Sequence, residues 1–239
     1  MQNIIIFGIG ALLCSLFLSN FIKLSNILKG EDFSLKEYVS NFKLKNIDMK
    51  YVIIFFILFL IMLKPYDIIH CLLIMPVFFG LILALIMDKK YMIIPNTCSI
   101  VILICGIMNL TCDFSKEKLI ISTIGLLVGG LTLFVIDFIF EKITHKEGFG
   151  YGDMKLLASI GMLLGYKDII VIMILSVILS AIYSIAYIII NKLVKKIDEV
   201  YLPFGPFIVI STFILYIIPS SQIINWYVAF MNILVNKMI

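Results

Sequence analysis

The sequence EGFGYGDM occupies residues 147–154 and delivers one carboxylate, Asp153, to the start of an apolar stretch. A charged side chain near the bilayer core costs about 2.5–3.5 kcal/mol, so acids in apolar chains tend to mark proton relays, ion paths or catalysis. A purely structural interpretation is equally open at this point. An acid in the first turn of a helix is favoured by the helix dipole.

The composition around this motif is that of an integral membrane protein. Of the 239 residues, 62% are hydrophobic and 14% are charged, whereas soluble domains carry about 25% charged residues. A membrane-spanning helix needs about 20 apolar residues, and segments 3–22, 119–140 and 169–190 satisfy this directly. The longer run 51–87 predicts two helices joined by a tight external turn.

Shorter apolar segments complete the predicted architecture, and they cover residues 97–110, 154–166, 207–218 and 223–235. We therefore predict an all-α, polytopic membrane protein with about eight transmembrane helices before the last segment. That last segment, 223–235, either crosses the membrane or lies along its interface. Two parts are expected: an N-terminal anchor with a cytoplasmic loop in residues 1–50, and a multi-span domain in residues 51–239.

The lysines predict the orientation of the chain. The sequence has no arginine, and most lysines fall in loops that would share one side, at residues 23–50, 89–90, 142–146 and 192–196. By the positive-inside rule these loops are cytoplasmic and the N-terminus lies outside. The first apolar run lacks the marks of a cleavable signal peptide, so we expect it to remain as an anchor. Because the basic residues are spread over separate loops, they do not indicate nucleic-acid binding.

A second acid has a similar predicted depth. Asp88 ends the apolar run 68–87 and precedes two lysines and Pro95. Folding could therefore bring Asp88 next to Asp153 at the cytoplasmic boundary. Taken alone, Asp88 is better explained as an interfacial charge beside its lysines.

The segments that follow the two acids are short. Segments 97–110 and 154–166 would reach roughly 20 Å at 1.5 Å per residue, less than the hydrocarbon core of about 30 Å. The loops carrying the acids are thus expected to dip inward, where irregular backbone needs protein or a water-filled cavity around it. Gly148, Gly150 and Gly152 suit such a loop, because glycine permits unusual backbone angles and close approach.

Two carboxyls in a wet, recessed pocket favour hydrolysis by an aspartyl dyad. Adjacent carboxyls cannot both ionise easily, so one keeps a proton. The ionised member takes a proton from the attacking water, and the protonated member donates to the oxygen that becomes negative. Such a mechanism uses no metal and no serine or cysteine nucleophile. The regularly spaced Cys98, Cys105 and Cys112 are expected to be small packing residues.

Three blocks of the sequence resemble the type IV prepilin peptidases, bacterial membrane aspartyl proteases of the GxGD type. The blocks are Asp88 followed by Pro95-Asn96, KEGFGYGDMKLLA at residues 146–158, and PFGP at residues 203–206. They occur in the family order and span about residues 68–210. The resemblance implies the GxGD aspartyl protease architecture.

The resemblance also implies a function. Asp88 and Asp153 would be the catalytic pair, with no cofactor. The substrate would be the N-terminal leader of a type IV prepilin or pseudopilin, cut on the cytoplasmic side after a glycine that precedes a hydrophobic segment. The location would be the bacterial inner membrane, with the active site facing the cytoplasm and with lipids and the substrate as the partners.

Further residues receive predicted roles from the same blocks. The residues expected to shape the pocket are Gly148, Gly150, Gly152, Pro95, Pro203, Gly205 and Pro206. Glu147 and Lys155 are candidate contacts for the substrate. A helix entry with loop charge explains Glu147 equally well, and a proline-bracketed turn explains the block from Pro203 to Pro206 equally well.

The N-terminal part departs from the family. Many members carry paired C-x-x-C zinc sites in a cytoplasmic insert, associated with methylating the new N-terminus using S-adenosylmethionine. Residues 23–50 contain no cysteine, and a zinc site needs about four thiolate or imidazole ligands. Methylation, and with it a need for S-adenosylmethionine, is therefore not expected.

Two other functions use the same acids. A proton- or cation-coupled transporter would place them near the bilayer midplane within broken helices of related halves, and the sequence shows no internal repeat. A presenilin-like intramembrane protease shares Gly-Tyr-Gly-Asp but has a tyrosine before its first aspartate, where Met87 stands here.

Two features outside the three blocks are expected to be structural. Asp137 is interpreted as an interfacial charge, since no motif includes it. Gly125 and Gly129, with Gly130, are typical of a close-packing surface between helices.

Overall fold

The computed structural model describes residues 68–112, 114–145, 148–194 and 202–238, with a few N-terminal residues (12–16, 19, 52–53 and 56). Most of the predicted N-terminal part, residues 1–50, and most of the segment 51–67 lie outside this description. Glu147 does as well.

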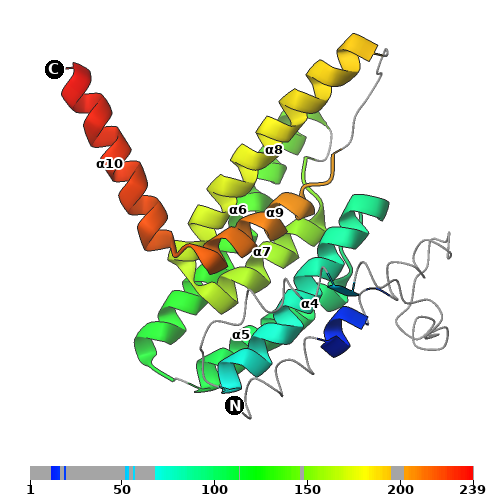
Figure 1. Ribbon diagram of the computed structural model, residues 1–239, viewed down its shortest axis with the longest axis vertical. Coiled ribbons are helices and arrows are strands. Elements are labelled where there is room, and N and C mark those ends of the chain that lie inside the picture. Colours follow the sequence, from blue (N-terminus) through cyan, green and yellow to red (C-terminus); the bar gives the residue numbers. More distant parts are fainter. Residues whose placement is uncertain are drawn as a thin grey trace.

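Seven helices make up most of the described regular structure (Figure 1), and the described N-terminal residues 12–16 are helical as well. The seven helices are α4 (Ile68–Tyr91), α5 (Asn96–Cys112), α6 (Lys116–Thr144), α7 (Tyr151–Leu164), α8 (Tyr166–Val194), α9 (Gly205–Ile217) and α10 (Ser220–Met238). Each apolar segment predicted between residues 97 and 235 coincides with one of these helices, because a continuous apolar run favours a helix whose backbone bonds are internal.

Some of these helices are long enough to cross a membrane. The helix α6 and the Tyr166–Ile190 part of α8 are long and apolar enough to cross a bilayer. The helix α9 would form a third span if it is joined to Ser220–Ala229 of α10, from which it is bent by 90°. In Figure 1, α10 projects away from the other helices after this bend.

The end of α4 differs from the expectation. Asp88 does not follow the helix but lies in its last turn, because the helix continues to Tyr91. It ends at Met92, whose left-handed backbone (φ 56°) turns the chain while its N–H donates to the Asp88 carbonyl at 2.8 Å. Lys89 and Lys90 extend the helix favourably, since cations stabilise the C-terminal end.

The helices α6 and α7 pack through glycine, as predicted for Gly125 and Gly129. A Cβ atom on Gly129 would lie 2.5 Å from the Leu157 carbonyl oxygen, and one on Gly161 would collide with the backbone of Gly125. The two backbones are therefore in direct contact. Gly165, at φ 92°, then joins α7 to α8 in a single residue, and its left-handed conformation is one that favours glycine.

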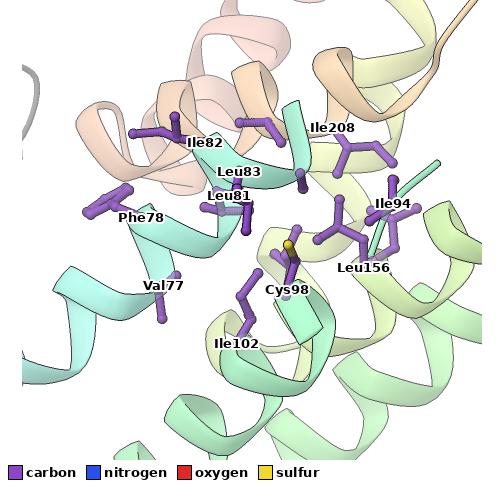
Figure 2. Close-up of a cluster of buried hydrophobic side chains, with 14 of the residues drawn as sticks. Val77, Phe78, Leu81, Ile82, Leu83, Ile94, Cys98, Ile102, Leu156 and Ile208 are labelled. Carbon is purple, nitrogen blue, oxygen red and sulfur yellow. The ribbon is translucent and has the colours of Figure 1, made fainter. Parts of the chain in front are cut away.

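The main core forms where α4, α5, α7 and α9 meet (Figure 2). Leu81, Ile102, Leu156 and Ile208 are fully buried there. Cys98 is buried among them, and Cys105 is buried as well, which confirms the packing role predicted for these two residues; Cys112 is exposed. This core holds the helices that carry the two predicted acids.

Candidate active site

Both predicted acids line the same cavity, which has a volume of about 400 Å³. Asp88 comes from the last turn of α4 and Asp153 from the first turn of α7. The two side chains are only 6% and 7% exposed. The linker after α4, the glycine-rich loop before α7, the middle of α8 and the segment leading into α9 form the rest of the wall.

Asp88 is held by the third sequence block. The Gly205 N–H donates to Asp88 Oδ2 at 2.9 Å, and Gly205 is the first residue of α9. A carboxylate is unfavourable at the C-terminal end of its own helix but favourable at the N-terminal end of another. The N-terminal end of α9 therefore offsets the unfavourable interaction of the Asp88 carboxylate with the dipole of α4.

Asp153 has one oxygen without a partner. Its backbone N–H donates to the Gly150 carbonyl at 3.0 Å, which places the residue in the first turn of α7. The Oδ1 atom is buried and has no hydrogen-bond partner among the residues described. Asp88 is near enough to act electrostatically on Asp153. Buried polar atoms normally have partners, so this unpartnered carboxyl oxygen is unusual.

The linker residue Ile94 explains two of the motif glycines. A Cβ atom on Gly152 would lie 3.0 Å from Ile94 Cβ, and one on Gly205 would lie 3.0 Å from Ile94 Cδ1. Ile94 is 8% exposed and belongs to the core. Its side chain thus lies between the blocks that carry Asp153 and hold Asp88, and glycine at both positions leaves room for it.

Aromatic rings connect the second and third blocks. Phe149 and Phe204 meet edge to face, with ring centroids 5.4 Å apart. Both residues line the cavity, as do Gly148, Gly150 and Pro203. Of the remaining predicted pocket residues, Pro95 accepts the Cys98 N–H at 3.0 Å and so begins α5, while Pro206 lies in the first turn of α9.

Lys155 points to a different place. Its Nζ donates to Asn96 Oδ1 at 3.0 Å, and both residues line a second cavity between α5, α6 and α7. Lys155 is not among the residues that line the cavity of the two acids. Its contact with a substrate therefore stays a prediction, as does that of Glu147.

The interpretation of Asp137 as an interfacial charge is wrong. Asp137 is 6% exposed, and its Oδ1 accepts the N–H groups of Gly148 and Phe149, both at 2.8 Å. The glycine-rich loop could have indicated that Asp137 accepts hydrogen bonds from loop N–H groups. Irregular backbone away from water needs acceptors for its N–H groups, and Asp137 is a carboxylate shortly before the loop in the sequence.

A comparison with known families places these residues in context. Residues 75–185 match the type IV leader peptidase family. The matched segment contains both acids and the glycine-rich loop, whereas the PFGP block lies beyond it.

Individual relatives point the same way. The chain is 31% identical over 141 residues to a prepilin leader peptidase/N-methyltransferase of Aeromonas hydrophila, covering 59% of this chain and 47% of the relative. It is 30% identical over 152 residues to a protein of the same name from Legionella pneumophila, covering 63% of this chain and 50% of the relative. The chain thus spans about half the length of these relatives. No solved structure matches it.

Proposed function

We propose, on the premise that residues 75–185 belong to the type IV leader peptidase family, that this chain is an aspartyl endopeptidase of the membrane. The observation that carries the proposal is the meeting of two buried acids from α4 and α7 on one cavity. The match of residues 75–185 to the family model and the cavity shared by the two acids both support the proposal.

The proposed reaction is peptide hydrolysis by the pair. Asp88 and Asp153 share one proton, because two neighbouring carboxyls resist ionising together. The ionised carboxylate removes a proton from a water molecule that attacks the scissile carbonyl, and the protonated carboxyl donates to the developing oxyanion. The cavity that both acids line, about 400 Å³ in volume, has room for that water. Collapse of the tetrahedral intermediate then breaks the C–N bond, and the amine leaves with a proton from the pair.

The proposed substrate is the leader of a type IV prepilin or pseudopilin. Such a substrate carries a hydrophobic segment after the cleaved glycine, so its apolar part would lie in the membrane beside the protease. The apolar side chains of Phe149, Phe204 and Phe207 in the cavity wall fit the chain on the hydrophobic side of the bond. We keep Glu147 as a proposed contact for the basic leader and Lys155 as a second proposed contact.

The proposed topology extends beyond the two or three spans identified by length and hydropathy. We propose about eight crossings, with the N-terminus outside and the cavity of the two acids open toward the cytoplasm of a bacterial inner membrane. The lysines at the end of α4 and in the last turn of α6 support this orientation.

The proposed enzyme works as a peptidase without methyl transfer. Its relatives are named leader peptidase/N-methyltransferase, but residues 23–50 hold no cysteine for a zinc site. We propose that the hydrolytic step needs no cofactor, because the two acids supply both the general base and the general acid.

The test is co-expression with a prepilin that has a lysine-containing leader, a glycine and a hydrophobic segment, followed by mass spectrometry of the N-terminus. Asp88→Asn and Asp153→Asn are each expected to lower cleavage by at least about a hundredfold, because each removes one proton-transfer group. Protein abundance in the membrane should not change. The same spectra report any added methyl group.

The matched control is Asp168→Asn, which changes an acid in the first turn of α8 whose Oδ1 accepts the Ser220 hydroxyl. Cleavage by this variant should equal that of the native chain, because Asp168 does not line the cavity. Substantial cleavage by either dyad variant would refute the proposal.

A further inference from the structure

The proposed mechanism does not use Asp137, a buried acid close to the glycine-rich loop. Asp137 belongs to α6, whereas the acids of the dyad belong to α4 and α7. One of its oxygens, Oδ1, accepts two backbone N–H groups at 2.8 Å each, from Gly148 and Phe149. Two short hydrogen bonds from consecutive N–H groups to one buried oxygen make Asp137 an anchor for this loop.

The loop is shaped to reach that anchor. Helix α6 ends at His145, whose left-handed backbone (φ 55°) reverses the chain while its N–H donates to the Glu141 carbonyl at 2.8 Å. The chain then returns to α6 at Gly148. A Cβ atom there would lie 2.9 Å from Phe140 Cδ1 and 3.2 Å from Asp137 Oδ1. Phe140 and Asp137 therefore form a seat that fits glycine.

From this anchor, short connections lead to both acids. The residue after Phe149 is Gly150, whose carbonyl accepts the Asp153 N–H at 3.0 Å. In the other direction, the Phe149 ring packs on Phe204, and the next residue, Gly205, donates its N–H to Asp88. Movement of the loop at Phe149 would thus shift both carboxyls relative to each other.

We propose that Asp137 is a positioning residue: its carboxylate fixes the glycine-rich loop and thereby sets the separation and orientation of Asp88 and Asp153. This inference rests on the proposed peptidase function. Asp137 does not touch the reacting atoms. Its effect passes through two backbone N–H groups, which would lose their buried acceptor if the carboxylate were removed.

Three variants test the proposal in the prepilin cleavage assay with purified enzyme. Asp137→Ala removes the acceptor and should lower kcat by on the order of a hundredfold, the effect expected of a misplacement near 1 Å. KM should stay nearly unchanged, since the loss concerns the transition state. Asp137→Asn keeps an oxygen acceptor and should recover most of the lost kcat.

The control for a merely structural role is Leu133→Ala, which removes a buried apolar side chain one turn earlier in α6. This variant should lower the thermal unfolding temperature yet keep the kcat of the folded enzyme. The proposal is overturned if Asp137→Ala keeps native kcat, or if Asp137→Asn is as inactive as Asp137→Ala.

A second measurement does not depend on protease activity. In a chain whose native cysteines are replaced by alanine, the pair Asp88→Cys and Asp153→Cys, which would line one cavity, should be cross-linked by a short bis-maleimide in isolated membranes. Adding Asp137→Ala should remove most of the cross-linked product, whereas adding Leu133→Ala should leave it. An unchanged yield with Asp137→Ala would overturn the positioning role even if the chain cleaves no prepilin, so the two proposals fail separately.

Discussion

At the scale of single residues, the position of Asp88 depends on a backbone atom from a distant part of the chain. The acid lies in the last turn of α4, where the helix dipole disfavours a negative charge. The Gly205 N–H, at the start of α9, offsets this by donating to Oδ2. Because the donor is a backbone N–H, the hydrogen bond itself does not need a particular side chain at position 205. Glycine is needed there because the Asp88 carboxyl leaves no space for a Cβ atom.

Gly205→Ala is predicted to impair the site. The new Cβ would lie 2.7 Å from Asp88 Oδ2 and 3.0 Å from Ile94 Cδ1, so the carboxyl must move. We expect kcat for prepilin cleavage to fall by at least about tenfold, since small displacements of catalytic groups are costly. Steady-state kinetics on the purified variant would measure this.

Gly80→Ala is the matched control for that substitution. Its Cβ would meet nothing closer than 3.5 Å, an ordinary van der Waals distance. Alanine is also favoured over glycine inside a helix by about 1 kcal/mol. Native kcat and equal or higher stability are expected, and equal kcat values for the two glycine variants would contradict the role of Gly205.

At the scale of elements, the direct backbone contact of α6 and α7 aligns the site. Gly125 and Gly129 of α6 face Gly161 and the Leu157 carbonyl of α7. The same pair of helices carries the anchor Asp137 and the acid Asp153. Their close approach therefore fixes α7, which carries Asp153, against α6, which holds the glycine-rich loop through Asp137.

Gly161→Ala is predicted to separate these helices. Its Cβ would collide with the Gly125 carbonyl oxygen, which belongs to a helix backbone and cannot rotate away. We expect a loss of stability of about 1–3 kcal/mol, the usual cost of overpacking. Thermal unfolding in detergent micelles would detect it.

The comparison variant for the helix contact is Gly130→Ala. Its Cβ would lie 3.2 Å from the Ala158 Cβ and 4.0 Å from the Met154 carbonyl oxygen. A change of less than about 1 kcal/mol is expected, because the helix propensity of alanine opposes the tighter contact. A Gly161→Ala protein as stable as the Gly130→Ala protein would show that the backbone contact is unimportant.

At the scale of the whole molecule, the proposed topology puts the two ends of α6 on opposite sides of the membrane. The helix is 29 residues long, which is sufficient to cross a bilayer. Its N-terminal end follows the exposed Phe114, and its C-terminal end contains the exposed Thr144. The site loop continues directly from that second end.

Labelling of single cysteines is the measurement for this topology. In the background without native cysteines, Phe114→Cys should react with a membrane-impermeant maleimide in intact cells. Thr144→Cys should react only in inverted membrane vesicles. These expected sides follow from the positive-inside distribution of the lysines. The opposite pattern of labelling would reverse the proposed orientation.

The sequence alone determined the helical character of the described chain, most helix positions, the close-packing glycine surface of α6, and the two acids as the pair to examine. These features follow from local patterns, because apolar runs require internally bonded helices and an acid in such a chain is conspicuous. The end of α4 was misplaced, since the left-handed turn at Met92 has no glycine to mark it.

Only the tertiary structure decided how the acids are held. Asp88 meets the Gly205 N–H, Ile94 lies against Gly152 and Gly205, and Asp137 binds the loop N–H groups. The partners in these contacts are mostly backbone atoms, which every residue except proline carries in the same form. A sequence pattern cannot show which backbone N–H group a carboxylate will meet, because that depends on how the helices pack.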